Sequence, residues 1–305
     1  MSGPSRASGR PAAAAAPRTT PPAALAVAIE NASQLDPVGD KLTAAIRKAL
    51  PAGPLKDLLS GTWLGHALHP LLTDLPIGAW SSSLVLDFVG GRRARPAADR
   101  LIAFGILTAV PAALTGAADW GDTQTKERRV GLVHAAANTT ALLFYCGSLR
   151  ARQRGNRIRG LGLSLAGASA LGAGGYLGGH LVFALGLGVD VTVFEARPPD
   201  WVDVAADHEV VDGKPIAVAP AGVEILLARE DGKLLALADR CTHRGAPLHE
   251  GKQHDGCIEC PWHQSIFRLT DGAIIQGPAT TPAPRYEVRA RDGRIEVRAA
   301  REPAA

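Results

Sequence analysis

Apolar residues are distributed unevenly along the 305-residue chain. Four long apolar stretches lie between residues 69 and 189, and three of them (101–118, 130–149 and 161–189) contain no Asp, Glu, Lys or Arg. About 20 apolar residues in a helix span the ~30 Å hydrocarbon layer of a bilayer. We therefore expect a bundle of four transmembrane helices over residues 69–189.

The first of these stretches, residues 71–89, is the least apolar because it contains Asp74 and Asp87. Its length still suits a span, and the Arg cluster at 92–95 follows it as a stop. Core helices of a soluble protein are the alternative, which the Arg clusters between the stretches disfavour. The last stretch has two overlapping small-xxx-small pairs within residues 174–179, a spacing typical of close helix packing in lipid.

The segment before the bundle has no sustained apolar period at its start. Residues 1–35 are rich in Ala, Pro and Ser, and we expect a disordered lead-in there. Asp36-Pro37 is typical of a helix start, and the spacing that follows predicts an amphipathic helix to about Leu50. Residues 36–68 are therefore expected to form this helix and a pre-membrane segment, at the membrane surface or against the bundle.

From about residue 200 the pattern changes to short apolar runs separated by Asp-Gly turns. Such runs predict strands joined by hairpins, and the clearest are residues 216–219, 223–228 and 234–238. The expected fold is thus a multidomain membrane protein, with an all-α four-helix transmembrane bundle followed by an all-β domain over residues 200–300.

The averages over the whole chain conceal this division, since 46% of residues are hydrophobic and 20% are charged. That apolar content excludes a fully disordered chain, and four cysteines in 305 residues are too few for a disulfide-stapled secreted domain. The net charge of +4 is small. It gives no reason to expect a nucleic-acid partner.

The strongest chemical signal is a pair of short loops in the β domain. One contains Cys241 and His243, and the other contains Cys260 and His263. A single zinc ion held by all four side chains is one interpretation, although zinc fingers usually pair Cys with Cys and His with His. A mixed pair in each loop suits two metal positions, one taking both sulfurs and the other both imidazoles.

These loops resemble the Rieske [2Fe–2S] family, together with the Cys-Thr-His-Arg-Gly run at 241–245 and the Gly-Pro-Ala-Thr run at 277–280. The resemblance implies a 2Fe–2S cluster in which Cys241 and Cys260 bind one iron and His243 and His263 bind the other. Imidazole ligands raise the reduction potential above that of an all-cysteine ferredoxin cluster.

Differences from the family pattern narrow the subtype. Respiratory members carry an additional Cys in each loop, where Ala246 and Trp262 stand here, so the ferredoxin-like type is the closer resemblance. Ser265 matches a serine that donates to a bridging sulfide, and Gln264 replaces a common glycine. We recognise no second, mononuclear iron site, and therefore expect an electron-transfer component rather than a complete catalytic subunit.

Polar residues within the apolar stretches are a second candidate site, because such residues are costly in a bilayer and indicate function. His69, His134 and His180, with Asp119, fall at one membrane face when the spans are followed in alternation. Two of these histidines could be axial ligands of a b-type haem: His134 with His180, or either with His69. The alternatives are a quinone site and a patch of interhelical hydrogen bonds.

Two runs, 65–70 and 175–180, resemble an uncharacterised bacterial four-helix membrane family found fused to Rieske domains. This resemblance brings no established activity. An excess of Arg marks cytoplasmic loops, so the Arg-rich loops of the bundle are expected in the cytoplasm and the cluster on the outer side. The lack of an export signal and of the loop disulfide instead favours the cytoplasm for the cluster. The sequence alone does not decide between these two sides.

The expected function is one-electron transfer by a Rieske protein anchored in the bacterial cell membrane as a multi-pass protein. The expected partners are the lipid bilayer and a quinone, a haem or a redox partner protein. A membrane-bound redox sensor or scaffold is one alternative, and a ferredoxin-like electron donor to a separate oxygenase is another.

Overall fold

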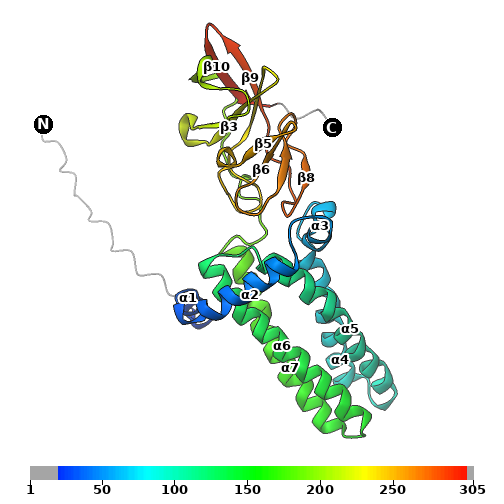
Figure 1. Ribbon diagram of the computed structural model, residues 1–305. Helices are drawn as coiled ribbons and strands as arrows, with labels where there is room; N and C mark the ends of the chain where they lie inside the picture. The colour runs from blue at the N-terminus through cyan, green and yellow to red at the C-terminus, as the bar shows by residue number, and fades with distance from the viewer. Residues whose placement is uncertain (1–19, 301–305) are drawn as a thin grey trace, which may run out of the picture.

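The computed structural model describes residues 20–300, which form a helical part and a β domain standing at one end of it (Figure 1). The helices are α1 (Pro21–Glu30), α2 (Asp36–Ala49), α3 (Pro54–Ser60), α4 (Leu68–Val89), α5 (Arg95–Trp120), α6 (Thr125–Gln153) and α7 (Arg157–Phe183). Helix α2 confirms the helix predicted from Asp36 to about Leu50.

Helices α4 and α5 pack as one hairpin, and α6 and α7 pack as a second (Figure 1). The turn before α7 contains Asn156, whose side chain accepts a hydrogen bond from the Arg159 backbone N–H at 3.1 Å. The hairpins meet where Trp80 stacks on Tyr145, with ring centroids 4.2 Å apart. Gly105 lies against the indole, where a Cβ atom would clash with it.

A buried ion-paired cluster joins all four long helices at the end away from the β domain. Arg152 of α6 donates to Asp87 of α4 at 2.9 Å and to Asp99 of α5 at 3.1 Å. Arg157 of α7 pairs with the same two carboxylates. The Arg152 side chain is fully buried, so these partners offset the cost of removing its charge from water.

Two helical segments within residues 20–300 are long and apolar enough to cross a membrane, Arg92–Trp120 and Thr125–Gln153. Helix α4 contains Asp74 and Asp87, and α7 is rich in glycine, which is less apolar than Leu or Val. The helices therefore exist where four spans are predicted, but a membrane-spanning character is supported for two of them.

The prediction of a disordered lead-in is wrong for residues 21–35, and its first part, residues 1–19, lies outside the described residues. Pro21 and Pro22 stand in the first turn of α1, where a missing backbone N–H costs nothing. Ala26 is fully buried against α6 and α7. The carboxylate of Glu30 is held by His180 at 2.8 Å and Lys126 at 3.2 Å. Tertiary contacts thus order a segment that has no periodic pattern of its own.

The β domain contains three small antiparallel sheets, ordered β1-β10-β9, β2-β3-β4 and β5-β6-β7-β8. The strands are β1 (Val202–Ala206), β2 (Ile216–Val218), β3 (Ile225–Glu230), β4 (Lys233–Ala238), β5 (Lys252–His254), β6 (Cys257–Glu259), β7 (Ile266–Arg268), β8 (Ile274–Gln276), β9 (Tyr286–Arg291) and β10 (Arg294–Ala299). The predicted Asp-Gly turns join β3 to β4 and β9 to β10, with positive φ at each Asp and Gly.

Candidate functional site

Two loops of the β domain carry the predicted donors, and they share one backbone design. In the first, the Cys241 N–H donates to Ala246 O at 2.8 Å, and the Gly245 N–H donates to Cys241 O at 2.7 Å. In the second, the Cys260 N–H donates to Ser265 O at 2.7 Å, and the Gln264 N–H donates to Cys260 O at 3.1 Å. Each cysteine therefore stands at the start of a closed turn.

The fourth residue after each cysteine has a left-handed backbone. Gly245 has φ 72°, and Gln264 has φ 63° at the equivalent place. Glycine adopts this conformation freely, whereas any other residue is strained there. Gln264, which stands where glycine is common, therefore adds backbone strain to the second loop, although the turn itself is retained.

The two sulfurs lie together, and backbone N–H groups point at them. Those of His243 and Arg244 donate to the Cys241 sulfur, and those of Trp262 and His263 donate to the Cys260 sulfur. The thiols also share a hydrogen bond, which together with burial raises the pKa of Cys241. The same hydrogen bond lowers the pKa of Cys260 to about 7, against the opposing effect of burial. Backbone donors of this kind stabilise a thiolate.

The two imidazoles lie beside each other, with ring centroids 5.0 Å apart and planes at 80°. The Nδ1 atoms of His243 and His263 are buried and have no hydrogen-bond partner among residues 20–300. Burial lowers the pKa of His243 well below the ordinary range and lowers that of His263 to about 4, so both rings are neutral near pH 7. A neutral imidazole with an unpaired nitrogen is the form that ligates a metal.

The donor set fits a binuclear centre better than a single ion. Within residues 20–300 no group of three or more His, Cys, Asp or Glu side chains is close enough to hold one metal ion. The four donors instead divide into two sulfurs and two imidazole nitrogens. This division disfavours the single zinc site considered from the sequence and suits a [2Fe–2S] cluster.

A third loop, residues 277–284, lies over the other two. The Thr242 hydroxyl donates to Thr281 O at 2.7 Å, and the Ala279 N–H donates to the fully buried Ser265 hydroxyl at 3.0 Å. Because the Ser265 oxygen acts there as an acceptor, its own proton remains available for a donor role.

The helical part covers the outer edge of His243. Asp122, in the turn between α5 and α6, has Oδ2 3.8 Å from His243 Nε2 and 2.8 Å from Lys56 Nζ. Lys56 and Asp122 are both buried. Sequence analysis missed both residues, because they lie in separate segments and only the docked domains bring them to the histidine.

Two further contacts hold this interface. Arg244, next to a predicted ligand, pairs with Glu127 of α6 at 2.7 Å. The Gly277 N–H of the third loop donates to Asp57 of α3 at 3.0 Å. Burial raises the pKa of Asp57, and this hydrogen bond opposes the shift. The first and third of the cluster-side loops therefore contact the helical part directly.

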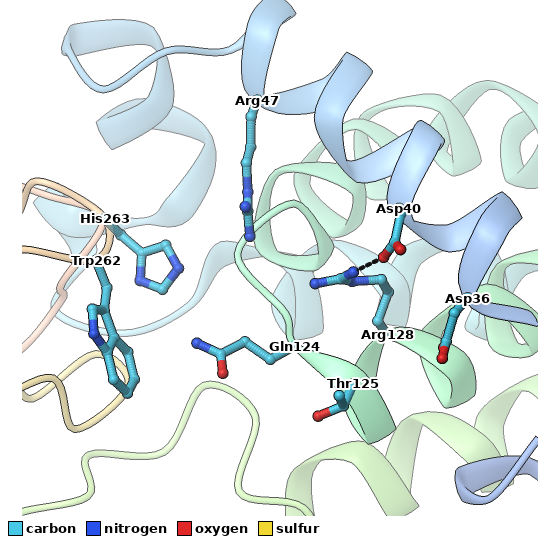
Figure 2. A pocket seen from close by; sticks show the side chains of 8 residues that line it. All are labelled: Asp36, Asp40, Arg47, Gln124, Thr125, Arg128, Trp262 and His263. Carbon is cyan, nitrogen blue, oxygen red and sulfur yellow. Dashed lines mark hydrogen bonds and ion pairs between the residues drawn. The ribbon is translucent and has the colours of Figure 1, made fainter. Parts of the chain in front are cut away.

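His263 faces an open polar pocket of about 530 Å³ between the two parts (Figure 2). Figure 2 shows Arg47 and Gln124 between the His263 ring and the ion pair of Arg128 with Asp40. The residues that line the pocket are Asp36, Asp40, Arg47, Gln124, Thr125, Arg128, Trp262 and His263. The two predicted imidazole ligands thus have different outer surroundings, one covered by charged residues and one accessible.

The three histidines predicted as a second site in the helical part do not form one group. His69 and His134 lie together, with ring centroids 6.3 Å apart. His180 is turned to Glu30 of α1, with Nε2 2.8 Å from the carboxylate. Because α1 is absent from the sequence prediction, nothing in the apolar pattern separated His180 from the other two.

Comparisons with known proteins match both parts of the chain. A family model described as the Rieske [2Fe-2S] domain matches residues 200–287, and a model described as a predicted membrane protein, DUF2231, matches residues 65–191.

Relatives of the β domain include ferredoxin components. The anthranilate 1,2-dioxygenase ferredoxin subunit of Burkholderia cepacia is 36% identical over 34% of this chain and 95% of its own length. The ferredoxin component of the naphthalene 1,2-dioxygenase system of Pseudomonas aeruginosa is 30% identical over 32% of this chain and 93% of its own. A solved structure, the ferredoxin of carbazole 1,9a-dioxygenase from Nocardioides aromaticivorans IC177, is 29% identical over 33% of this chain and 98% of its own, with a TM-score of 0.32.

Proposed function

The chain belongs to the Rieske [2Fe-2S] family, and from this premise we propose that it is a membrane-anchored one-electron carrier. Cys241 and Cys260 bind one iron of the cluster, and His243 and His263 bind the other through Nδ1. The observation that carries this proposal is the division of donors into two sulfurs and two unpaired imidazole nitrogens in one buried site.

The cluster, when bound, supplies reversible uptake and release of one electron. The chain's own residues set how easily that occurs. Backbone N–H groups directed at the sulfurs favour the reduced, more negative state, as does the neutral charge of the imidazoles. The Ser265 hydroxyl has a proton left to donate in the same direction. We therefore expect a potential above the usual ferredoxin range.

We further propose that the helical part is a multi-pass anchor in the cell membrane. The match to a predicted membrane protein family supports this, as do the two helices long and apolar enough to cross. Helices α4 and α7 complete the four-span bundle in this proposal. Their large exposed apolar side chains, such as Phe88 and Phe183, then face lipid rather than water.

The electron partner is proposed to act at the membrane face of the cluster. His243 is covered by Lys56 and Asp122, so the accessible imidazole is His263, at the pocket beside Arg47 and Gln124. A quinone headgroup fits this place by chemistry, because its oxygens accept hydrogen bonds from imidazole, guanidinium and amide N–H groups.

Substitution of single ligands tests the cluster assignment in full-length protein. We expect Cys241→Ala and His263→Ala each to abolish the EPR signal of the reduced cluster. Cys257→Ala and His254→Ala are matched controls, since Cys257 is a free thiol in β6 and His254 is half-exposed. A signal that survives either ligand substitution, or that disappears in either control, contradicts the assignment.

A second candidate function is electron donation to a separate oxygenase, which the likeness to dioxygenase ferredoxin components favours. Reduction in isolated membranes separates the two functions. Reduction of the cluster by an added quinol supports the membrane route. Failure with quinol but rapid reduction by a flavin-dependent ferredoxin reductase supports the donor function.

A further inference from the structure

His69 of α4 and His134 of α6 form a second histidine pair, which the proposed function does not use. They belong to different hairpins, and their rings lie 6.3 Å apart with planes at 81°. Both lie at the end of the helices nearest the β domain, since His69 begins α4 and His134 is in the third turn of α6.

The same backbone contact orients each ring. His69 Nδ1 is 2.8 Å from Ala112 O of α5, and His134 Nδ1 is 2.8 Å from Gly174 O of α7. A carbonyl oxygen only accepts, so Nδ1 carries the proton in both rings and Nε2 carries the lone pair. This is the arrangement in which metal-ligating histidines are held by their surroundings.

The lone pairs at Nε2 are not consumed by other side chains. His69 Nε2 has no hydrogen-bond partner among the described residues. Near His134, the Asn138 amide nitrogen is 3.3 Å from Nδ1 and 3.2 Å from Nε2. A donor equidistant from both ring nitrogens does not lie along the Nε2 lone pair, and Asn138 already donates to His134 O at 2.9 Å.

Glycines on the opposite helix of each hairpin make room for the rings. A Cβ atom on Gly116 would lie 2.7 Å from His69, and one on Gly178 would lie 3.1 Å from His134. Gly175, one position along from Gly174, has no neighbour within 4 Å. The glycines of α7 that face α6 therefore accommodate His134 and its neighbour Asn138.

A site with only two histidine ligands restricts the class of metal centre that it can bind. A bare transition-metal ion in a protein usually has three or more protein ligands, and no such group exists among residues 20–300. A tetrapyrrole supplies four ligands itself and needs only two axial groups. Two imidazoles on opposite sides of one iron have ring centres roughly 6.4 Å apart, given metal–nitrogen bonds of about 2.0 Å.

We propose that His69 and His134 are the axial ligands of a b-type haem held between the two hairpins. Of the pairs that the sequence left open, the geometry selects this one and leaves His180 to Glu30. The haem would be a second redox centre, in a domain to which the comparisons assign no chemistry.

The haem would lie close to the Rieske site. Gly116, against His69, precedes Asp122 by six residues, roughly 9 Å along a helix, and Asp122 is 3.8 Å from His243. One electron can pass from the reduced cluster to ferric haem, which leaves an oxidised cluster and ferrous haem without another reactant. This transfer rests on the proposed function, whereas haem binding does not.

The test uses full-length protein from cells supplied with a haem precursor. Pyridine haemochrome assay should give one haem per chain, and the dithionite-reduced spectrum should be that of a six-coordinate b-type haem. We expect haem content to fall at least tenfold in His69→Ala and in His134→Ala and to be unchanged in His180→Ala. The cluster EPR signal should persist in all three variants.

His69→Met covers the case in which an alanine variant does not fold, because a methionine can still ligate and should change the spectrum rather than remove it. Absence of haem after growth with precursor and after titration with haemin overturns the proposal. So does equal haem loss in His180→Ala, or extraction of a quinone in place of haem. Loss of the cluster with haem retained contradicts the proposed function alone.

Discussion

The two histidine pairs are similar in arrangement and differ in which ring nitrogen is available to bind a metal. In the β domain the rings are 5.0 Å apart at 80°, and in the helices they are 6.3 Å apart at 81°. In the β-domain pair, Nδ1 is buried and has no hydrogen-bond partner among the described residues. In the helical pair, a backbone carbonyl accepts a hydrogen bond from each Nδ1, so Nε2 carries the lone pair. The backbone around a histidine therefore decides which of its nitrogens can serve a metal.

The largest effect is expected from changing one imidazole ligand of the β-domain pair into a thiolate. His263→Cys should retain a cluster and lower its reduction potential by on the order of 100 mV, because the added negative charge favours the oxidised state. An EPR-monitored redox titration measures the shift. An unchanged potential would mean that His263 is not bound to iron.

The helical pair should respond to steric change at its glycines. Gly116→Leu places a side chain where the His69 ring lies, so haem content should fall about tenfold and stability by about 1–3 kcal/mol. Gly175→Leu is the matched control, since that position has open space. Haemochrome assay and thermal unfolding measure both quantities. Equal haem content in the two variants would contradict the pairing.

The contact between the two parts should tune the β-domain pair. Asp122→Asn removes a negative charge beside His243 and leaves the Lys56 ammonium unpaired, which favours the reduced cluster. The potential should rise by tens of millivolts, on the order expected for one charge at this range. Asp255→Asn, at an exposed carboxylate in the β5–β6 turn, should leave it unchanged. A fall in the Asp122 variant would refute the docked arrangement.

The third helical histidine provides a pH test of its separate role. Burial raises the pKa of Glu30, but hydrogen bonds from His180 and Lys126 outweigh it, and the net pKa is below its ordinary value. The ionised carboxylate therefore stabilises α1 above the unfolded-state pKa of about 4.3, and this contribution is lost as pH falls through the folded-state pKa. Hydrogen-exchange protection factors in α1, which correct for the intrinsic pH dependence of exchange, should fall on acidification below about pH 4.5. Glu30→Gln should largely remove that dependence, and an unaltered dependence would assign it to another group.

The smallest effect is expected at the strained loop position. Gln264→Gly should raise the unfolding free energy by up to about 1 kcal/mol, because glycine relieves a left-handed backbone. Gly245→Gln, at the equivalent place in the other loop, should lower it. Denaturation of both variants with the cluster intact gives the comparison. The same sign for both changes would show that the two turns are not equivalent.

The difference between the pairs also explains what the sequence could predict. Cys241 and His243 are two residues apart, so a local motif indicates their shared site. His69 and His134 are 65 residues apart, and only packing of the two hairpins shows that they, rather than His180, lie together. Local pattern likewise cannot show that Asp122 reaches His243, because this contact depends on how the β domain docks.

For helix α1 the prediction was wrong because it expected disorder where the chain is helical. Two prolines and an alanine run have the composition of a disordered segment, and the ordering contacts come from residues far along the chain, such as Lys126 and His180. The expected strands and Asp-Gly turns were predictable, since their signals lie within a few residues.

The ion-paired cluster around Arg152 restricts the order in which the chain can be assembled during synthesis. Asp87 of α4 is almost fully buried, and its main partner is made 65 residues later. An unpaired buried carboxylate costs several kcal/mol, so the first hairpin cannot settle into its final place before α6 has emerged. During synthesis Asp87 of the first hairpin must therefore stay hydrated or protonated until the second hairpin supplies Arg152 and Arg157.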